Sequence, residues 1–242
     1  PGFAGGDRTD IALPAIQQKL LEALHATGKP VVLVLTTGSA VGLKWAKENL
    51  PGVLVAWYPG QQGGNALADV LFGDVSPAGR LPVTFYESVA QLPPFADYDM
   101  EGRTYRYFRG EPVYPFGYGL SYTRFAYSDL VVSATPAASS GQIDVDATVK
   151  NTGSRAGEDV VQLYVRDAAA TPPAAIRNLR GFQRIRLAPG EEKRVRFTLA
   201  VPRIGSGPQT TEATSPMLTG RSFTILIAVS AISSSRVVIA RL

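Results

Sequence analysis

The chain has 242 residues and a formal net charge of +4, and 45% of its residues are hydrophobic against 18% charged. This balance supplies enough apolar side chains for a packed core and excludes a disordered chain or a coiled coil. Lys and Arg are scattered along the chain, whereas a nucleic-acid-binding protein would gather them on one element or stripe.

The residue inventory excludes several kinds of chemistry. There is no cysteine, so disulfides, thiolate nucleophiles and Cys-ligated metals are excluded. His25 is the only histidine, so a His-based metal site would have a single ligand. We expect no metal, no cofactor and no membrane-spanning helix, since no run of about twenty apolar residues occurs. The opening Pro-Gly-Phe-Ala-Gly-Gly has neither an initiator methionine nor a leader, which indicates a piece of a longer protein.

Residues 1–86 alternate between helical and strand patterns. Apolar residues at helical spacing predict helices over 16–24, 39–49 and 64–72. The runs 31–35, 53–57 and 81–85 predict strands, and the first two are continuously apolar, as in a parallel sheet covered on both faces. Three strands make a thin sheet, so this region is interpreted as the C-terminal half of an α/β sandwich domain.

Residues 87–123 are an aromatic-rich connector punctuated by Gly and Pro. A segment of this kind cannot bury its rings alone, so we expect it to lie across a neighbouring domain surface. An ordinary inter-domain linker with packed aromatics is the alternative. The rings belong to Phe95, Tyr98, Tyr105, Tyr107, Phe108, Tyr114, Phe116, Tyr118 and Tyr122.

Residues 124–242 have an all-β pattern. Short strands are predicted over 130–133, 143–150, 160–166, 180–187, 193–199, 222–230 and 237–240, with turns at 151–153 and 188–191. Val145, Ala147 and Val149 are expected to face a core, and the residues from Asp144 to Lys150 that alternate with them, Asp146 included, are expected to face water. The pattern predicts a fibronectin type III-like β-sandwich.

Two groups of residues could carry chemistry on their own. The glycine-rich loop 60–64 follows a strand and opens a helix, but it lacks the Lys-Ser/Thr of a phosphate-binding loop, so a nucleotide-binding enzyme is the weakest alternative. Carboxylates occur at Asp7 and Asp10 and again at 97, 99 and 101. Glycoside cleavage needs two of them on either side of the scissile bond, yet neither set is specific.

Several ordered motifs together resemble the second and third domains of glycoside hydrolase family 3. The N-terminal motif is Gly6-Asp7-Arg8, and further matches run in sensible order over about residues 1–200. The matching segments are 30–39, 56–73, 77–85 (PAGRLPVTF), 114–123 (YPFGYGLSYT), 149–165 and 179–191.

The resemblance implies a retaining exo-β-glycosidase that acts on terminal β-D-xylosyl or β-D-glucosyl residues. Its nucleophile Asp would lie on a missing N-terminal (β/α)8 barrel, and its acid/base Glu would lie just before Gly6, so no catalytic residue is assigned to this chain. Asp7 and Arg8 would support the loop that bears that Glu. Arg103 and Tyr105, in a segment similar to the family's GRTYRY, would lie near the substrate, or Arg103 would instead be satisfied by backbone carbonyls.

The expected partners are therefore the missing barrel of the same enzyme and an oligo- or disaccharide substrate, with no nucleic acid and no membrane. The sequence is compatible with a homodimer, and the expected location is the bacterial periplasm or the medium. The competing hypothesis is a non-catalytic carbohydrate-binding or structural module, because sugar rings stack on aromatic side chains and the connector is rich in them.

Overall fold

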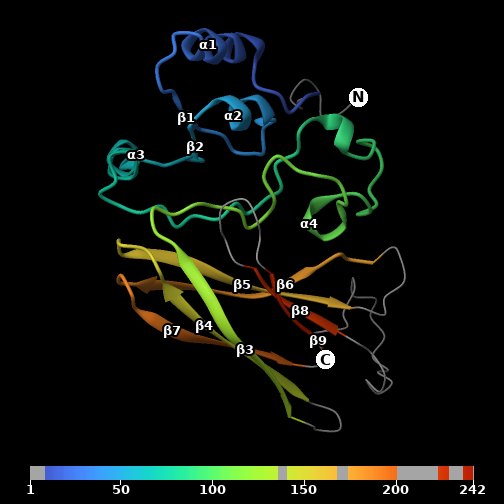
Figure 1. The fold of residues 1–242 in the computed structure, drawn as a ribbon. Coiled ribbons are helices and arrows are strands. Elements are labelled where there is room, and N and C mark those ends of the chain that lie inside the picture. The colour runs from blue at the N-terminus through green and yellow to red at the C-terminus, as the bar shows by residue number, and fades with distance from the viewer. Residues whose placement is uncertain (1–8, 136–140, 168–173, 201–222, 229–236, 242) are drawn as a thin grey trace. The chain divides into compact units, whose positions relative to one another are not determined.

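The computed structural model of the protein describes residues 9–135, 141–167, 174–200, 223–228 and 237–241. The chain divides into two units (Figure 1). Unit 1 consists of residues 1–75 and 81–116, and unit 2 consists of residues 76–80 and 117–242. The three-part division expected from the sequence stays a prediction.

Unit 1 begins with helix α1 (Ala15–His25), which confirms the first predicted helix. Pro14 is its N-cap residue, as expected for a residue whose ring fixes φ and which has no N–H to leave unsatisfied. Leu21 is the buried residue of this helix, whereas Ile16 and Leu20 remain 76% and 59% exposed. Within the described residues, α1 therefore carries an apolar stripe that is largely uncovered.

Strands β1 (Val32–Leu35) and β2 (Gly52–Val55) form a two-stranded parallel sheet, with Val32 opposite Gly52 and Leu35 opposite Val55. Helix α2 (Lys44–Asn49) lies between them in the chain, which is the crossover expected for parallel strands. Helix α3 (Gly63–Phe72) follows β2 and ends at Gly73, whose φ of +86° is the left-handed conformation that glycine adopts freely. The core of this region is formed by Leu35, Val41, Leu43, Phe85 and Val113.

Two predicted elements of unit 1 were wrong in extent or type. The second helix begins at Lys44 and not at residue 39, because Gly42 donates its N–H to the Ile11 carbonyl at 2.8 Å and forms a parallel bridge with Ala12. The strand expected over 81–85 is reduced to one antiparallel bridge between Phe85 and Tyr114. Pro82 in this stretch has no N–H to contribute to a ladder.

The remainder of unit 1 carries little regular structure. It contains a 3-10 turn η1 (Val89–Gln91) and a short helix α4 (Thr104–Tyr107), joined by loops. Thr104 has a φ of +56°, which is unusual for a residue with a β-branched side chain.

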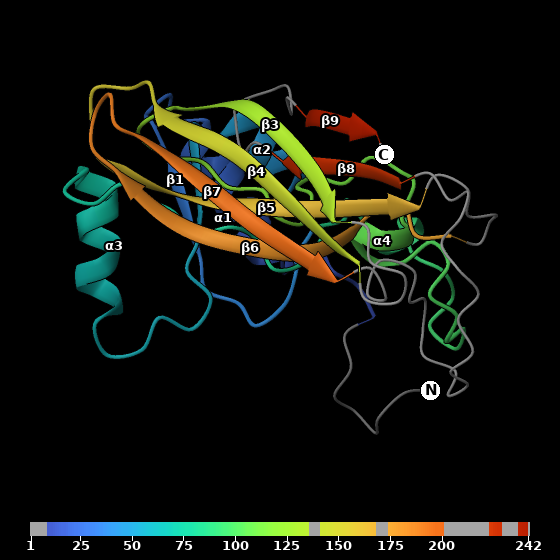
Figure 2. The same ribbon diagram turned by 90° about the horizontal axis from the view of Figure 1, so that it is seen from below.

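Unit 2 is an antiparallel sandwich of two sheets, whose strands can be followed in Figure 2. One sheet has the order β3-β4-β7 and the other has the order β6-β5-β8-β9. Each of the seven predicted strands has a counterpart among the described residues: β3 (Phe125–Thr135), β4 (Gln142–Asn151), β5 (Gly157–Asp167), β6 (Asn178–Leu187), β7 (Glu192–Ala200), β8 (Phe223–Ala228) and β9 (Val237–Arg241). Residues 222, 229 and 230 of the strand predicted over 222–230 lie outside the described residues.

Strand β4 shows why the alternating pattern was a good predictor and where it failed. Val145, Ala147 and Val149 are buried in the sandwich core, as expected. Asp146 was expected to face water, but it is only 3% exposed. Arg196 lies directly opposite on β7 and donates to both carboxylate oxygens of Asp146, at 2.8 and 3.0 Å, so long arginine side chains cover the aspartate.

Candidate functional site

The residues expected to support or approach a substrate fall in two places. Asp7 and Arg8 lie outside the described residues. Arg103 and Tyr105 lie in unit 1, at the start of α4. Whether any of these side chains approaches a substrate stays a prediction.

Arg103 is the centre of a loop formed by residues 93–103, which we call the arginine-centred loop. Its guanidinium group donates to three backbone carbonyls of that loop: Asp97 at 2.6 Å, Pro94 at 2.9 Å and Asp99 at 3.2 Å. Charge-assisted bonds from one planar group fix the three carbonyls relative to one another. This arrangement matches the alternative interpretation, in which backbone carbonyls satisfy Arg103.

Local backbone chemistry closes the same loop. The Asp97 side chain accepts a hydrogen bond from the N–H of Asp99 at 2.9 Å, and the N–H of Arg103 donates to the Met100 carbonyl at 3.0 Å. Gly102 has a φ of +72°, and a Cβ at this position would lie 3.2 Å from the Pro93 ring. The sequence Met-Glu-Gly-Arg therefore turns here because glycine is present.

Tyr105 faces inward within unit 1. Its ring stacks on Phe116 with centroids 4.2 Å apart and an interplanar angle of 17°. Nearby, the N–H of Thr104 donates to the Tyr86 hydroxyl at 2.8 Å, and burial raises the pKa of that phenol. Tyr86 in turn contacts Phe108 edge-on. These contacts pack much of the connector's aromatic content into unit 1 and give α4 a fixed position there.

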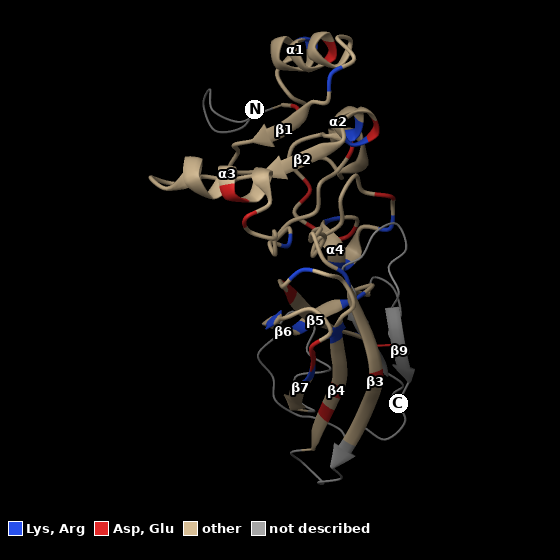
Figure 3. Ribbon diagram, turned by 60° about the vertical axis from the view of Figure 1, so that its left-hand side comes forward, with Lys and Arg blue, Asp and Glu red and all other residues tan. Residues whose placement is uncertain are grey.

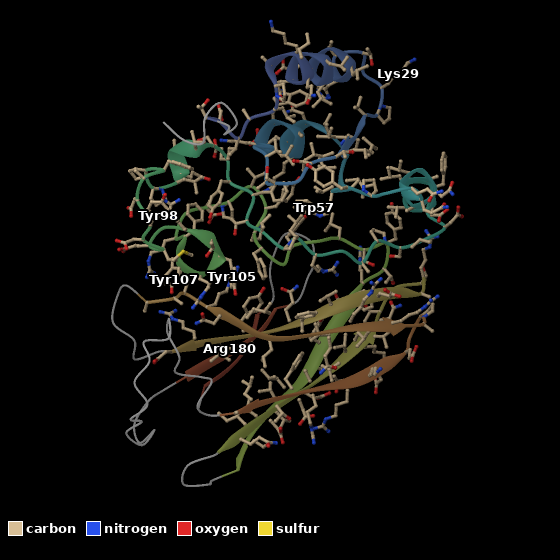
Figure 4. All side chains as sticks on the ribbon, turned by 180° about the vertical axis from the view of Figure 1, so that it is seen from behind. Lys29, Trp57, Tyr98, Tyr105, Tyr107 and Arg180 are labelled. Carbon is tan, nitrogen blue, oxygen red and sulfur yellow. The ribbon has the colours of Figure 1, made fainter. Side chains whose placement is uncertain are left out.

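Two rings of the arginine-centred loop are not packed in this way. Phe95 is 72% exposed and Tyr98 is 89% exposed, and Figure 4 shows Tyr98 at the outer edge of the loop. The carboxyl-bearing residues of the loop, Asp97, Asp99 and Glu101, are exposed as well. The composition of the connector predicted that its rings would pack across a neighbouring domain surface, and it could not separate Phe95 and Tyr98 from the rings that are buried.

The other candidates from the sequence show no distinct chemistry in the described residues. Gly60 at the start of the glycine-rich loop adopts a φ of +68°, and Gly63 packs against the Pro59 ring. Among the described residues, no group of three or more His, Cys, Asp or Glu could hold a metal ion, and no helix is long and apolar enough to cross a membrane. Lys and Arg are interspersed with Asp and Glu along the described elements (Figure 3).

Sequence reasoning missed a buried polar cluster in unit 2. Arg80 donates to Asp159 at 2.6 Å, and their side chains are 5% and 0% exposed. The Tyr127 hydroxyl donates to the other oxygen of Asp159 at 2.5 Å. Burial, reinforced by the negative charge of Asp159, raises the pKa of Tyr127 far above its usual range. The matching motif PAGRLPVTF was a signal for Arg80, but nothing local pointed to its partner.

A second cluster covers the outward face of β5. Gln162 donates to the Gly117 carbonyl at 3.1 Å and accepts from the Tyr164 hydroxyl at 2.6 Å. Gly117 has a φ of +81°, and a Cβ there would lie 2.2 Å from the Gln162 side-chain oxygen. Segment 117–123 can approach the strand this closely only because residue 117 is glycine. The outward face of β5 is consequently covered by this segment.

Two segments of the chain match known protein families. Residues 3–122 match the glycosyl hydrolase family 3 C-terminal domain, and residues 159–212 match a fibronectin type III-like domain. The chain belongs to glycosyl hydrolase family 3. The matches confirm the predicted fold class, which is a piece of an α/β sandwich followed by a fibronectin type III-like β-sandwich.

The relatives of this family 3 chain are named as β-glycosidases. It is 47% identical over 190 residues to a xylan 1,4-beta-xylosidase from Xylanibacter ruminicola, covering 78% of this chain and 22% of the relative. It is 42% identical over 206 residues to a periplasmic beta-glucosidase from Salmonella typhimurium, covering 80% of this chain and 27% of that relative. A solved β-glucosidase from Erythrobacter marinus superimposes with a TM-score of 0.80 at 40% identity, covering 99% of this chain and 32% of that one.

The family 3 chain thus spans about a quarter of the length of the curated relatives that it matches, between 22% and 28%. The relatives are glycoside hydrolases, and the chain corresponds to the C-terminal part of the family. No residue of the chain is assigned as the nucleophile or the acid/base. The described side chains instead form one packed aromatic cluster, one exposed loop and two buried polar clusters.

Proposed function

We propose that this chain is the C-terminal part of a retaining exo-β-glycosidase that releases terminal β-D-xylosyl or β-D-glucosyl residues. The observation that carries the proposal is the family match over residues 3–122, together with relatives named as a β-xylosidase and a β-glucosidase. A nucleophilic Asp and an acid/base Glu, both outside this chain, would perform the chemistry. The barrel that bears the Asp is the proposed partner.

The side chains within the chain support a scaffold role. A general acid must hold its proton near neutral pH, so its pKa has to be raised. In Asp146 the hydrogen bond from Arg196 lowers the pKa, and in Asp144 the hydrogen bond from the Thr198 hydroxyl does the same. The Asp159 side chain is 0% exposed, and both of its carboxylate oxygens accept hydrogen bonds, one from Arg80 and one from Tyr127.

The test compares this chain with the enzyme that contains it. The 242-residue chain alone should give no turnover of nitrophenyl β-xyloside or nitrophenyl β-glucoside, whereas the intact enzyme should hydrolyse at least one of them. Proton NMR of the first product formed should show the β anomer, as retention requires. Robust hydrolysis by the isolated chain would contradict the scaffold role.

The second candidate function is a carbohydrate-binding or structural module without catalysis. The exposed rings Phe95 and Tyr98 favour it. A carbohydrate-binding surface on the outward face of β5 is disfavoured, because segment 117–123 covers that face through the contact between Gly117 and Gln162. Titration of the chain with xylo- and cello-oligosaccharides tests this function, and an absence of saturable binding at millimolar ligand would count against it.

We also propose that the intact enzyme is exported to the periplasm or the medium. The absence of cysteine is compatible with export, and one similar relative is named as periplasmic. Fractionation of cells that express the complete gene would test the location. We propose in addition that the intact enzyme is a homodimer, with which the sequence is compatible. Light scattering of the intact enzyme would test this oligomeric state.

A further inference from the structure

The arginine-centred loop presents large rings to solvent in an ordered setting. Phe95 and Tyr98 are 72% and 89% exposed, and the neighbouring Met100 is 47% exposed. Single exposed apolar residues are normal on protein surfaces, but several on one short loop indicate a surface that binds something. These rings contribute little to the core of unit 1, in contrast to Tyr105, which stacks on Phe116.

The loop is held in place before any ligand arrives. Arg103 donates to the carbonyls of Pro94, Asp97 and Asp99, and the Asp97 side chain accepts from the N–H of Asp99. Ordering a flexible loop on binding would lower the affinity, and a loop that is already ordered avoids most of that cost. The rings are therefore carried on a rigid support.

The polar side chains that share the loop with the two rings define the chemistry of the ligand. Asp97, Asp99 and Glu101 are exposed, and ionised carboxylates act only as hydrogen-bond acceptors. A pyranose offers hydroxyl donors around its edge and an apolar C–H face, which suits a loop that carries both acceptors and aromatic rings. Three carboxylates disfavour an anionic ligand such as a phosphate or a nucleic acid.

We propose that Phe95 and Tyr98 form a stacking platform for the leaving-group sugar of an oligosaccharide substrate. Asp99 and Glu101 accept hydrogen bonds from its hydroxyls, and Arg103 is a positioning residue that holds the loop. The proposal rests on the proposed glycosidase function. The terminal sugar that is released binds beside the two catalytic carboxylates, and no residue of this chain is assigned as either of them. We therefore assign the sugar-binding loop of this chain to the sugar on the leaving-group side of the scissile bond.

The experiment uses the intact enzyme and two substrates with the same terminal sugar. Xylobiose or cellobiose has a leaving-group sugar, whereas β-xylosyl or β-glucosyl fluoride has a leaving group without a ring. In Tyr98→Ala and Phe95→Ala, the ratio of kcat/KM for the disaccharide to kcat/KM for the fluoride should fall about tenfold. Tyr98→Phe keeps the ring and should recover most of that ratio.

Two further variants separate the platform from a general disturbance. Phe182 on β6 has an exposed fraction of 68%, similar to the 72% of Phe95, so Phe182→Ala is the matched control and should leave the ratio unchanged. Arg103→Met should raise KM for the disaccharide and speed amide hydrogen exchange over residues 93–103. A purely structural role for Arg103 would instead lower kcat/KM for both substrates together.

Three outcomes would overturn the platform. If the wild-type enzyme cleaves both substrates and the ring variants keep its ratio, the platform is wrong and the proposed function stands. If the ring variants lose activity equally on both substrates and melt at a lower temperature, the rings pack against another part of the protein. If the wild-type enzyme cleaves neither substrate, the proposed function fails and the platform fails with it.

Discussion

At the scale of single residues, Arg80 and Asp159 are coupled by burial. Their atoms are 2.6 Å apart, and 5% and 0% of the two side chains is exposed. Removing one partner of such a pair leaves an uncompensated buried charge, so Arg80→Met should lower the free energy of unfolding by about 3–5 kcal/mol in urea titrations. The control is Arg184→Met, which breaks the surface ion pair between Arg184 and Glu158. The Arg184 side chain is 67% exposed. This substitution should cost less than about 1 kcal/mol, and equal losses would contradict the prediction.

Gly117 and Gly190 allow a second comparison between single residues. They have nearly the same backbone, with φ of +81° and +78°, but only Gly117 has a close neighbour where a Cβ would stand. Gly190→Ala should lose about 1–2 kcal/mol for the left-handed conformation alone. Gly117→Ala should lose about 1–3 kcal/mol more, because its Cβ would collide with the Gln162 side chain. Equal losses in thermal or urea unfolding would show that segment 117–123 can move away from β5.

The candidate site illustrates what can be predicted for individual residues. The role of Arg103 and Tyr105 near a substrate stays a prediction, whereas the possibility that backbone carbonyls satisfy Arg103 could be stated from the chemistry of arginine. Which rings are buried could not be predicted. Tyr98 and Tyr105 differ only by seven positions in one irregular segment, and their environments depend on contacts such as that with Phe116. Without a period of 2 or 3.6, the sequence does not define a face.

At the scale of elements, strands with a clear alternation were predicted well, and elements that depend on a distant partner were not. The strands of the sandwich core follow from residues such as Val145 and Val149, which recur at every second position. Helix α2 was predicted too long because the bridge from Gly42 to Ala12 joins residues 30 positions apart. The strand expected over 81–85 was wrong because Tyr114, its only bridging partner among the described residues, pairs with Phe85 alone.

The pairing of β4 with β7 predicts a response to acid. The Arg196 guanidinium lowers the pKa of Asp146 below its ordinary value of 3.8, so the ionised form is favoured in the folded state. The stabilisation is complete above the unfolded-state pKa and is lost as the pH falls below it towards the folded-state value. Asp146→Asn should therefore destabilise the protein near pH 6, and the difference from wild type should shrink as the pH falls below 3.8.

The measurement is the free energy of unfolding in urea at a series of pH values. Asp69→Asn, on an exposed position of α3, is the control for the loss of one negative charge. It should give a curve parallel to that of the wild type. A difference between Asp146→Asn and wild type that stays constant down to pH values well below the ordinary pKa would contradict the role of Arg196.

At the scale of the whole chain, the order of the two fold types was predictable and their interleaving was not. An α/β piece followed by a sandwich follows from the change in periodicity along the sequence, whereas a separate aromatic connector between them stays a prediction. Residues 76–80, however, belong to unit 2 although they lie within the α/β region expected over residues 1–86. Arg80 and Asp159 are separated by 79 positions, and no local pattern reports an ion pair between residues so far apart.

Because residues 76–80 belong to unit 2, we expect Asp159→Asn to change the stability in opposite directions in residues 117–242 alone and in the 242-residue chain. Residues 117–242 expressed alone retain Asp159 and Tyr127 but lose Arg80, the cation that lies 2.6 Å from Asp159 in the 242-residue chain. Asp159→Asn should stabilise that fragment by about 1 kcal/mol or more, because it removes the uncompensated charge. In the 242-residue chain the same substitution should destabilise by a similar amount or more, because Arg80 then stays buried opposite a neutral amide. The measurement is the free energy of unfolding in urea, compared between Asp159→Asn and the unsubstituted protein in each length of chain. Destabilisation in both lengths would mean that the hydrogen bonds from the Tyr127 hydroxyl and the Val160 N–H, and not the contact with Arg80, account for most of the stability that Asp159 contributes.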